Sequence, residues 1–364
     1  MIRVPVTTPS RSYEVLIGSG LVARAGECLG NLLGSRRAFV VTTPPVRRRW
    51  AKVLVQSLTA AGIETALLEM ADGERAKRLV TLEKLAEQLV KRGADRGATL
   101  IALGGGVVGD VTGFLASIYM RGVDVIQIPT TVLAQVDAAI GGKTGVNLLS
   151  GKNLLGTFHQ PRAVLVDPAV LETLPAREYR AGLYEALKCG IIGDAGLFRL
   201  FEEKGKEILE RDPVVVEKVI ADSVRLKASV VSADEREGGL RQVLNLGHTI
   251  GHALEAETAY KVLLHGEAVA WGMVAATYIA LSTGKLDSVT AGRIMNAVLG
   301  LGELPRMNVK TANILKRLRS DKKTRQGVVH FILPREIGKV EITSDVGDAI
   351  VRAAVEDVRK LARN

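Results

Sequence analysis

The feature that most constrains the fold of this chain is the alternation of short strand-like runs with helical patterns in its first half. The strand-like runs cover residues 37–43, 64–70, 99–103, 125–128 and 163–166. The last three are predominantly apolar, which is typical of strands buried on both faces of a sheet. Residues 81–92 have the periodicity of an amphipathic helix. The alternation of strand and helix predicts a parallel, Rossmann-like sheet.

From about Pro175 the sequence pattern becomes mostly helical. The expected helices cover residues 177–191, 213–231, 248–257, 267–281, 288–299 and 345–361, and one strand-like run covers residues 328–333. Asp212 and Pro213 suit the N-cap and the first turn of the second helix. The predicted fold class is α/β, with a Rossmann-like nucleotide domain at residues 1–175 and a mostly α-helical domain at residues 176–364. We expect the catalytic cleft between the two domains.

Three of the five histidines fall within residues 244–267. His248 and His252 stand four residues apart in a helical pattern, so their imidazoles share one face. His265 follows after a short break, and such a grouping of imidazoles is typical of a divalent metal site. A helical histidine pair without a metal is the alternative for His248 and His252 alone. The third histidine and the flanking glycines favour the metal site.

Glu185 and Lys188 lie three residues apart on the helix expected at residues 177–191, so they share a face. The carboxylate of Glu185 could complete a zinc-type site that keeps one position open for substrate. The alternative is a surface ion pair, which would be worth about 0.2–0.5 kcal/mol. Lys227 and Arg241 flank an acidic turn just before the histidines.

A glycine loop at residues 104–110 joins a predicted strand to a predicted helix. It satisfies G-x-G-x-x-G, and glycines there let the backbone and the helix N-terminus approach a pyrophosphate. The alternative is a glycine-rich turn required only for packing. The loop follows what we count as the third strand, and no convincing acidic residue ends a strand about 20 residues later, unlike the usual arrangement. Residues 72–77 offer another partner for ribose hydroxyls, so we expect a nucleotide in a variant arrangement.

Composition bears on the partners of the chain. The net charge is +10, with basic clusters at residues 47–49 and 316–319. Zinc-finger spacing, an aromatic stacking motif and a basic tail are absent from the sequence, so a small anionic substrate is favoured over nucleic acid. The longest apolar run, at residues 268–281, is shorter than the ~20 residues of a membrane span, and it predicts a buried core helix. Without a signal-like start, and with Cys28 and Cys189 as the two cysteines, we expect a cytoplasmic protein with reduced thiols.

Ordered motifs along the whole chain resemble one family. The matching stretches are residues 72–77, 104–110, 129–137, 141–147, 152–161, 241–253, 265–267 and 337–339, and the helix that carries Glu185 and Lys188. Together they resemble 3-dehydroquinate synthase, a lyase of the shikimate pathway. The resemblance implies conversion of 3-deoxy-D-arabino-heptulosonate 7-phosphate to 3-dehydroquinate and phosphate. Transient oxidation with NAD, phosphate elimination, re-reduction and an intramolecular aldol closure make up that reaction.

The resemblance also assigns roles to residues of this sequence. It implies a divalent metal, Zn²⁺ or Co²⁺, held by Glu185, His248 and His265, and it directs His252 to the substrate phosphate instead. NAD-binding residues would be Asp72, Glu74, Lys77, Gly104, Gly105, Gly106, Val107, Gly109, Asp110, Thr130, Thr131, Lys143, Lys152 and Thr173. Substrate-binding residues would be Arg121, Lys143, Asn153, Lys227, Arg241, Asn245, His252 and Lys339. Catalytic residues would be Asp137, Lys188, His252 and Asn245.

Arg121 resembles an arginine that reaches the site of the neighbouring subunit, which implies a homodimer. The sequence departs from the family pattern at Thr43, where an Asp or Asn commonly contacts the nucleotide, and at the packing positions Cys189 and Leu246. Two enzymatic alternatives remain: a related sugar-phosphate cyclase, and a metal- and NAD-dependent polyol or glycerol-phosphate dehydrogenase. A nucleotide-binding regulatory protein without catalysis would be expected to lose part of this polar set.

Overall fold

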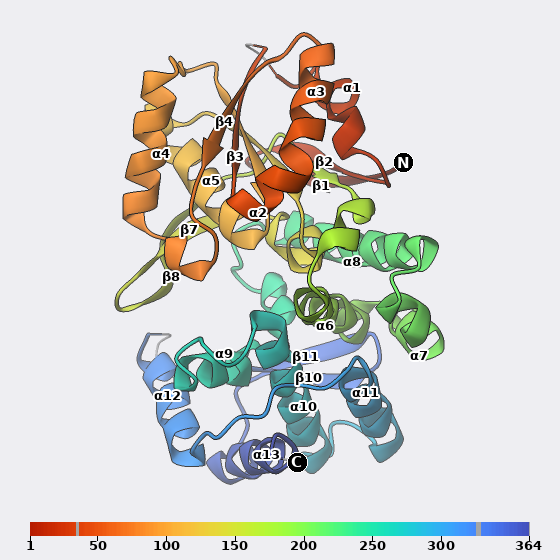
Figure 1. Cartoon of the computed structure of the whole chain (residues 1–364). Coiled ribbons are helices and arrows are strands. Elements are labelled where there is room, and N and C mark those ends of the chain that lie inside the picture. Colours follow the sequence, from red (N-terminus) through yellow and green to blue (C-terminus); the bar gives the residue numbers. More distant parts are fainter. Residues whose placement is uncertain (34–35, 325–328, 364) are drawn as a thin grey trace. The chain divides into compact units, whose positions relative to one another are not determined.

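The computed structural model describes residues 1–33, 36–324 and 329–363 (Figure 1). The described residues form two compact units. Unit 1 comprises Met1–Pro175 and Val216–Arg236, and unit 2 comprises Ala176–Val215 and the residues from Glu237 onward. The chain therefore leaves unit 1 after Pro175, where the sequence predicts a boundary. It returns to unit 1 for Val216–Arg236, a segment that the predicted boundary places in the second domain.

Unit 1 contains the mixed strand and helix elements of the chain. In order they are β1 (Ile2–Thr7), β2 (Ser12–Ile17), α1 (Ala25–Leu29), β3 (Arg37–Thr42), α2 (Pro44–Val46), α3 (Lys52–Ala60), β4 (Glu64–Glu69), α4 (Leu79–Lys91), β5 (Thr99–Gly104), α5 (Gly106–Ile118), β6 (Asp124–Pro129), β7 (Lys143–Leu148), β8 (Gly151–Phe158), β9 (Ala163–Val166) and most of α8 (Pro213–Ala233). Within the described residues, the large sheet has the order β1-β2-β9-β6-β5-β3-β4. Every pair from β2 to β4 is parallel, and β1 runs antiparallel to β2. The predicted parallel sheet is confirmed.

Two antiparallel pairs of unit 1 were not predicted from the sequence. One is β1 with β2, and the other is the hairpin β7–β8, which lies between the strand-like runs at residues 125–128 and 163–166, where no strand was predicted (Figure 1). Because β1 and β2 come first, the glycine loop follows β5 rather than a third strand. The central strands β5 and β9 are buried along their whole length, as their apolar sequences predict.

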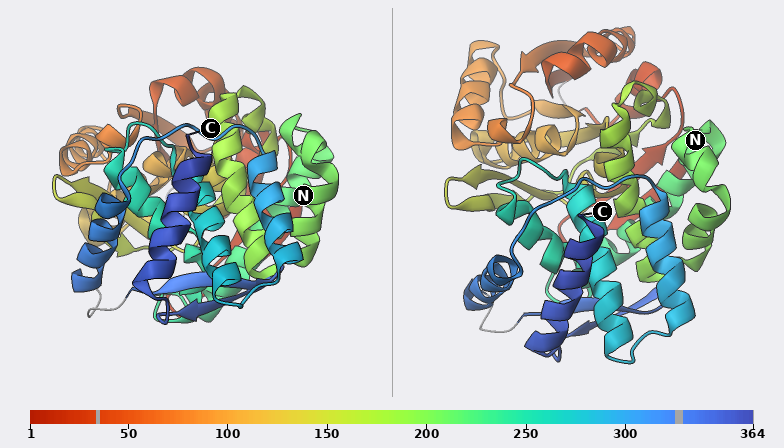
Figure 2. Two further views of the ribbon diagram at one scale, coloured as in Figure 1. Left: turned by 90° about the horizontal axis from the view of Figure 1, so that it is seen from below. Right: turned by 60° about the horizontal axis from the view of Figure 1, so that its bottom comes forward.

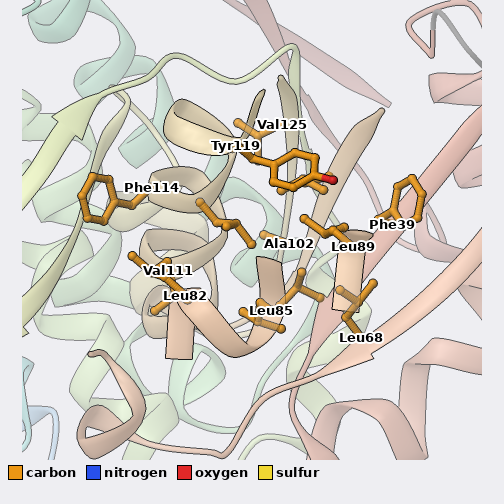
Figure 3. Close-up of a cluster of buried hydrophobic side chains, with 14 of the residues drawn as sticks. Phe39, Leu68, Leu82, Leu85, Leu89, Ala102, Val111, Phe114, Tyr119 and Val125 are labelled. Carbon is orange, nitrogen blue, oxygen red and sulfur yellow. The ribbon is translucent and has the colours of Figure 1, made fainter. Parts of the chain in front are cut away.

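The core on one side of the sheet is aliphatic. Leu82, Leu85 and Leu89 recur on one face of α4 and are buried together with Val111 of α5 and Leu68 of β4. Figure 3 shows these side chains gathered over the strands. Fully burying each leucine stabilises the fold by about 1.5–3 kcal/mol, so this cluster fixes α5, and with it the glycine loop, against the sheet.

The placement of Val216–Arg236 in unit 1 has a local cause at Glu235. This buried carboxylate accepts hydrogen bonds from Thr8 Oγ1 at 3.1 Å, from the backbone N of Ser10 at 3.3 Å and from Gln160 Nε2 at 2.9 Å. Desolvation raises its pKa, but the bonds from Ser10, Gln160 and Thr8 outweigh this and hold the pKa below its ordinary value of 4.5. A buried carboxylate requires such partners, and they tie the end of α8 to unit 1.

Unit 2 is mostly helical, as predicted. Its elements are α6 (Ala176–Gly193), α7 (Ala195–Leu209), α9 (His248–Glu257), α10 (His265–Ser282), α11 (Ser288–Gly300), α12 (Thr311–Thr324), β10 (Phe331–Glu336), β11 (Lys339–Thr343) and α13 (Asp348–Leu361). The nearly continuous burial of α10 confirms the predicted core helix, and α6, α9, α11 and α13 pack against it (Figure 2). Within the described residues, no helix has the length and apolar character required to span a lipid bilayer.

The expected helix ends agree closely with the structure where capping signals exist. α9 has the predicted bounds, and Asp212 Oδ1 accepts hydrogen bonds from the backbone N–H groups of Val214 and Val215 at 3.0 Å, which confirms the predicted N-cap. Val328, the first residue of the expected strand-like run, lies outside the described residues, and β10 begins at Phe331. α7, α12 and β11 were not predicted.

Candidate metal centre and nucleotide site

Glycines allow α6, α9 and α10 of unit 2 to approach one another at the expected metal ligands. A Cβ at Gly266 of α10 would lie 1.7 Å from the carbonyl oxygen of Ala181 on α6. A Cβ at Gly251 of α9 would lie 2.9 Å from the carbonyl oxygen of Ala268 on α10. Any side chain at these positions would separate the helices, so the glycines of the histidine segment serve close packing around the cluster.

The expected metal ligands converge where these helices meet. Oε1 of Glu185 lies 3.8 Å from Nε2 of His248 and 3.7 Å from Nε2 of His265. Ligand atoms of His248, His252 and His265 all lie within 4.8 Å of one another. Among the described residues, the buried Oε1 of Glu185 has no hydrogen-bond partner. A buried acceptor without a donor, facing imidazole nitrogens, fits a divalent cation of the zinc type.

The protonation of the two expected histidine ligands is set by their surroundings. Burial lowers the pKa of His248 well below its ordinary 6.5, and the nearby positive charge of Lys188 lowers it further. Burial also lowers the pKa of His265, but the hydrogen bond to Glu255 and the charge of Glu185 outweigh it and raise that pKa. Each imidazole is the first residue of a helix, where the helix dipole disfavours a positive charge. A neutral imidazole is the form that binds a metal.

Glu185 and Lys188 form a buried ion pair, so the alternative of a surface pair is wrong. The ammonium group of Lys188 contacts Glu185 Oε2, and the two side chains are 2% and 1% exposed. Arg241, in the 3₁₀ helix Leu240–Asn245, is also buried in unit 2. Burial of a charged group costs free energy and is tolerated where the group is paired.

Other expected substrate residues of unit 2 lie on neighbouring elements. Asn245 Nδ2 donates to Glu237 Oε1 at 2.7 Å, and Glu237 has a left-handed backbone with φ 60°. The sequence analysis treated Glu237 only as part of an acidic turn. Its position four residues before Arg241 could have indicated that it lies near the expected substrate residues. The strand of Lys339 packs against α6 and the Leu240–Asn245 helix, but its ammonium group pairs with Glu336 at 3.2 Å and the side chain is exposed.

Glu255 of α9 is a further carboxylate at the site, and the sequence did not single it out. It is buried, and its Oε2 lies 3.3 Å from Nδ1 of His265. A carboxylate at that nitrogen favours the tautomer that carries hydrogen on Nδ1 and leaves the Nε2 lone pair directed at Glu185. No sequence pattern predicts this role, because the sequence around Glu255 does not distinguish it from any other glutamate on a helix.

Glu255→Gln is therefore expected to bind Zn²⁺ roughly 10- to 100-fold more weakly than the unaltered chain, since carboxylates behind a histidine ligand contribute that much to metal affinity. Competition with a chelating dye measures the affinity. Glu257→Gln is the matched control, because Glu257 lies on the same helix and bonds to Asn313 and Arg317 instead. Equal zinc affinities in the two variants would contradict the role given to Glu255.

The glycine loop of unit 1 joins β5 to α5. Gly105 is the N-cap of α5, and no side chain caps it, so the first N–H groups of the helix face out of the loop. A Cβ at Gly104 would lie 2.5 Å from Val108, and one at Gly109 would lie 2.8 Å from Oε1 of Gln127. These glycines therefore have a packing role, as the alternative proposed. The same packing leaves an uncapped helix N-terminus at the carboxyl end of a parallel strand, which is an anion-binding arrangement.

Expected nucleotide and substrate residues lie together next to this loop. The buried Lys77 ammonium group contacts Asp110 Oδ2 and Asn153 Oδ1. Burial raises the pKa of Asp110, and the charge of Lys77 offsets part of the rise. Thr130 donates its backbone N–H to the Gly104 carbonyl at 2.9 Å. The structure thus brings one residue expected at the phosphate, Asn153, into direct contact with a residue expected at NAD.

The remaining expected residues of unit 1 occupy several elements. A Cβ at Gly105 would lie 3.0 Å from Thr131, so Thr131 borders the glycine loop, which also includes Gly106 and Val107. Lys227 of α8 forms an ion pair with Asp137, and Lys143 and Lys152 lie on β7 and β8. Asp72 is exposed just before the 3₁₀ helix Glu74–Ala76. Thr173 accepts a hydrogen bond from Trp50 Nε1 at 3.3 Å, and Thr43 is buried.

Arg121 lies in an exposed, conformationally unusual turn. It has φ 71° and follows Met120 with φ 51°, both in the left-handed region that non-glycine residues rarely adopt. Ile118 and Met120 beside it are exposed apolar side chains, and so is Phe158 of the β7–β8 hairpin. A backbone held in the left-handed region costs free energy and persists only where the surrounding structure enforces it.

Comparisons with known proteins agree along the whole chain. The family profile described as 3-dehydroquinate synthase N-terminal matches residues 67–181, and the one described as 3-dehydroquinate synthase C-terminal matches residues 182–324. A 3-dehydroquinate synthase from Koribacter versatilis (strain Ellin345) is 56% identical over 363 residues, which covers 100% of this chain and 99% of the relative.

Solved structures of sugar-phosphate cyclases share the fold. The 2-epi-5-epi-valiolone synthase ValA from Streptomyces hygroscopicus subsp. jinggangensis 5008, solved with NAD⁺ and Zn²⁺ bound, is 32% identical with a TM-score of 0.89, covering 96% of this chain and 98% of that one. A 2-deoxy-scyllo-inosose synthase complexed with carbaglucose-6-phosphate, NAD⁺ and Co²⁺ is 25% identical with a TM-score of 0.85, covering 99% of each chain.

Proposed function

The chain belongs to the 3-dehydroquinate synthase family, and from this premise we propose that it converts 3-deoxy-D-arabino-heptulosonate 7-phosphate to 3-dehydroquinate and phosphate. The enzyme class is an NAD- and metal-dependent, phosphate-eliminating lyase. The observation that carries the proposal is the convergence of buried Glu185 with His248 and His265, in a chain that both family profiles match. The 56% identity to a 3-dehydroquinate synthase, against 32% to a valiolone synthase, supports this substrate over that of other cyclases.

Glu185, His248 and His265 would hold the divalent cation, Zn²⁺ or Co²⁺. When bound, the cation supplies a Lewis acid for a substrate oxygen. The buried Oε1 of Glu185 and the lowered pKa of His248 support this ligand set. Lys188 would hold a proton near the substrate hydroxyls, where its buried ammonium group has little water to compete with.

NAD would bind to unit 1 and supply the hydride acceptor. The uncapped N-terminus of α5 and the glycine loop would receive the pyrophosphate, and Glu74 would lie near the ribose. The remaining residues proposed at NAD are Asp72, Lys77, Gly104, Gly105, Gly106, Val107, Gly109, Asp110, Thr130, Thr131, Lys143, Lys152 and Thr173. NAD⁺ in the solved relatives of this fold supports the same cofactor here.

The other expected substrate residues would bind the carboxylate at one end of the substrate and the phosphate at the other. Lys227 and Arg241 would bind the carboxylate, and Asp137 would contact substrate hydroxyls. The residues proposed at the phosphate are Lys143, Asn153, Asn245, His252 and Lys339. The positive charges of Lys143 and Lys339 would stabilise the phosphate as it leaves. Binding the substrate at both ends would favour the intramolecular ring closure. Lys227 is already paired with Asp137, so substrate binding would exchange that partner.

We also propose that the enzyme is a homodimer in which Arg121 reaches the site of the neighbouring subunit. The exposed turn around Arg121 and the exposed apolar side chains of Ile118 and Met120 next to it support such an interface. A second copy of the same surface would bury these side chains across a two-fold axis.

Phosphate release from the heptulosonate phosphate, with NAD in catalytic amounts, tests the proposed function. We expect phosphate and 3-dehydroquinate in equal amounts, loss of activity after chelation of the metal, and recovery when Zn²⁺ or Co²⁺ is restored. Bound NAD should be regenerated in each turnover, so free NADH should not accumulate.

Other outcomes of the same assay identify the alternatives. NADH formed in proportion to a polyol or glycerol phosphate would indicate a metal-dependent dehydrogenase. Faster release of phosphate from another sugar phosphate than from the heptulosonate phosphate would indicate a related cyclase. Activity unchanged after complete removal of the metal would contradict the proposed site.

A further inference from the structure

The β7–β8 hairpin contains an irregularity at Asn147. The strand register shifts between Val146 and Leu148, on either side of this residue. Residues 152–154 of β8 therefore lie opposite Asn147. Three residues of β8 thus oppose one residue of β7, so β8 is the bulged strand, and bulges are frequent next to functional sites.

Asn147 joins two segments of unit 1 through its backbone and its side chain. Its backbone N–H donates to the Lys77 carbonyl at 2.8 Å, and its Nδ2 donates to Glu74 Oε1 at 2.7 Å. Its Oδ1 accepts the backbone N–H of Asn153 at 2.9 Å. Asn147 is only 8% exposed. One buried side chain thus binds the Glu74–Lys77 segment on one side and β8 on the other.

The bond to Asn153 holds an unfavourable backbone conformation. Asn153 has φ 55°, in the left-handed region, which costs on the order of 1 kcal/mol and persists only where neighbours enforce it. The bond from its N–H to Asn147 and the contact of its Oδ1 with Lys77 do so. The backbone conformation of Asn153 therefore depends on Asn147 and on the Glu74–Lys77 segment to which Asn147 bonds.

We propose that Asn147 is a positioning residue that sets the nucleotide-contacting segment Glu74–Lys77 and the substrate-contacting residue Asn153 in register with each other. The inference rests on the proposed function, because the roles of these partners come from it. Asn147 itself would touch neither ligand. It acts through Glu74, whose carboxylate it orients, and through Asn153, whose backbone it fixes.

Two substitutions separate these two contacts. Asn147→Ala removes both side-chain bonds, so the Kd for NAD without substrate and the KM for the heptulosonate phosphate should each rise roughly tenfold, with kcat changed much less. Asn147→Asp keeps an acceptor for the Asn153 N–H but sets a second carboxylate against Glu74. It should raise the Kd for NAD as much as the alanine variant does and raise KM less. Calorimetric titration with NAD and steady-state kinetics measure these quantities.

Thr144→Val is the matched control for hairpin stability. Thr144 lies on the same strand, and its Oγ1 donates to the Thr157 carbonyl at 2.9 Å, away from Glu74 and Asn153. If it changes the Kd and KM as much as Asn147→Ala does, the role of Asn147 is merely structural and the inference fails. An unaltered chain that releases no phosphate, whatever the variants do, would instead reject the proposed function.

Discussion

Lys188→Met is expected to lose turnover by roughly 10²- to 10⁴-fold, the range for removal of a positioned proton donor or acceptor, while binding Zn²⁺ at least as tightly as before. The two effects separate because the Lys188 ammonium group contacts the same carboxylate that would bind the metal. Removing its positive charge leaves Glu185 more attractive to a cation. It also removes the group proposed to hold a proton near the substrate hydroxyls.

Kinetics and dye competition for Zn²⁺ on the same preparation test this separation. Lys204→Met is the matched control, because Lys204 is half-exposed on α7 and pairs with Glu207. His265→Ala provides the contrast, since it removes a proposed ligand and should lose zinc affinity and turnover together. Near-native turnover in Lys188→Met, or zinc affinity that falls along with turnover, would reject the role given to Lys188.

The large sheet and the core helices could be predicted because their signals are local. β5, β6 and β9 are short, predominantly apolar runs bounded by turn residues, and their shortness favours a buried parallel strand over a helix. The bounds of α9 follow from the glycine before it and from its own periodicity. The N-cap at Asp212 could be predicted because an aspartate directly before a helical pattern commonly caps the helix with its side chain.

The elements that were missed depend on contacts between distant residues. The β7–β8 hairpin is polar and glycine-rich, and its partly exposed strands have no apolar run to indicate them. The assignment of Val216–Arg236 to unit 1 depends on Glu235 meeting Thr8 and Gln160. Helical periodicity indicates that α8 is a helix, but it does not indicate which unit the helix packs against.

Residue spacing alone does not identify the ligands of the candidate metal centre. Spacing grouped His248, His252 and His265, and the structure places ligand atoms of all three within 4.8 Å of one another. Neither observation excludes His252 as a ligand, so the choice of Glu185, His248 and His265 rests on the resemblance and remains a proposal. The buried Glu255 behind His265 required the structure, because burial of a helical glutamate cannot be read from its neighbours in sequence.

Heterodimers that combine Arg121→Ala in one subunit with Lys188→Met in the other are expected to recover about half of the activity of the unaltered dimer, although each single variant is nearly inactive. In such a dimer, the subunit that keeps Lys188 would receive Arg121 from its partner, and its site would be complete. The other site would lack both groups. Two different affinity tags on co-expressed chains allow the mixed dimer to be isolated.

The recovery follows only if Arg121 acts across the interface. If Arg121 served the site of its own subunit, each site of the mixed dimer would lack one group, and activity would stay at the level of the single variants. Sedimentation measurements establish that the isolated species is a dimer, and a mixed dimer with Thr144→Val in place of Arg121→Ala controls for tagging and co-expression. A monomeric enzyme with full activity would exclude the shared site, because Arg121 could then reach no neighbouring subunit.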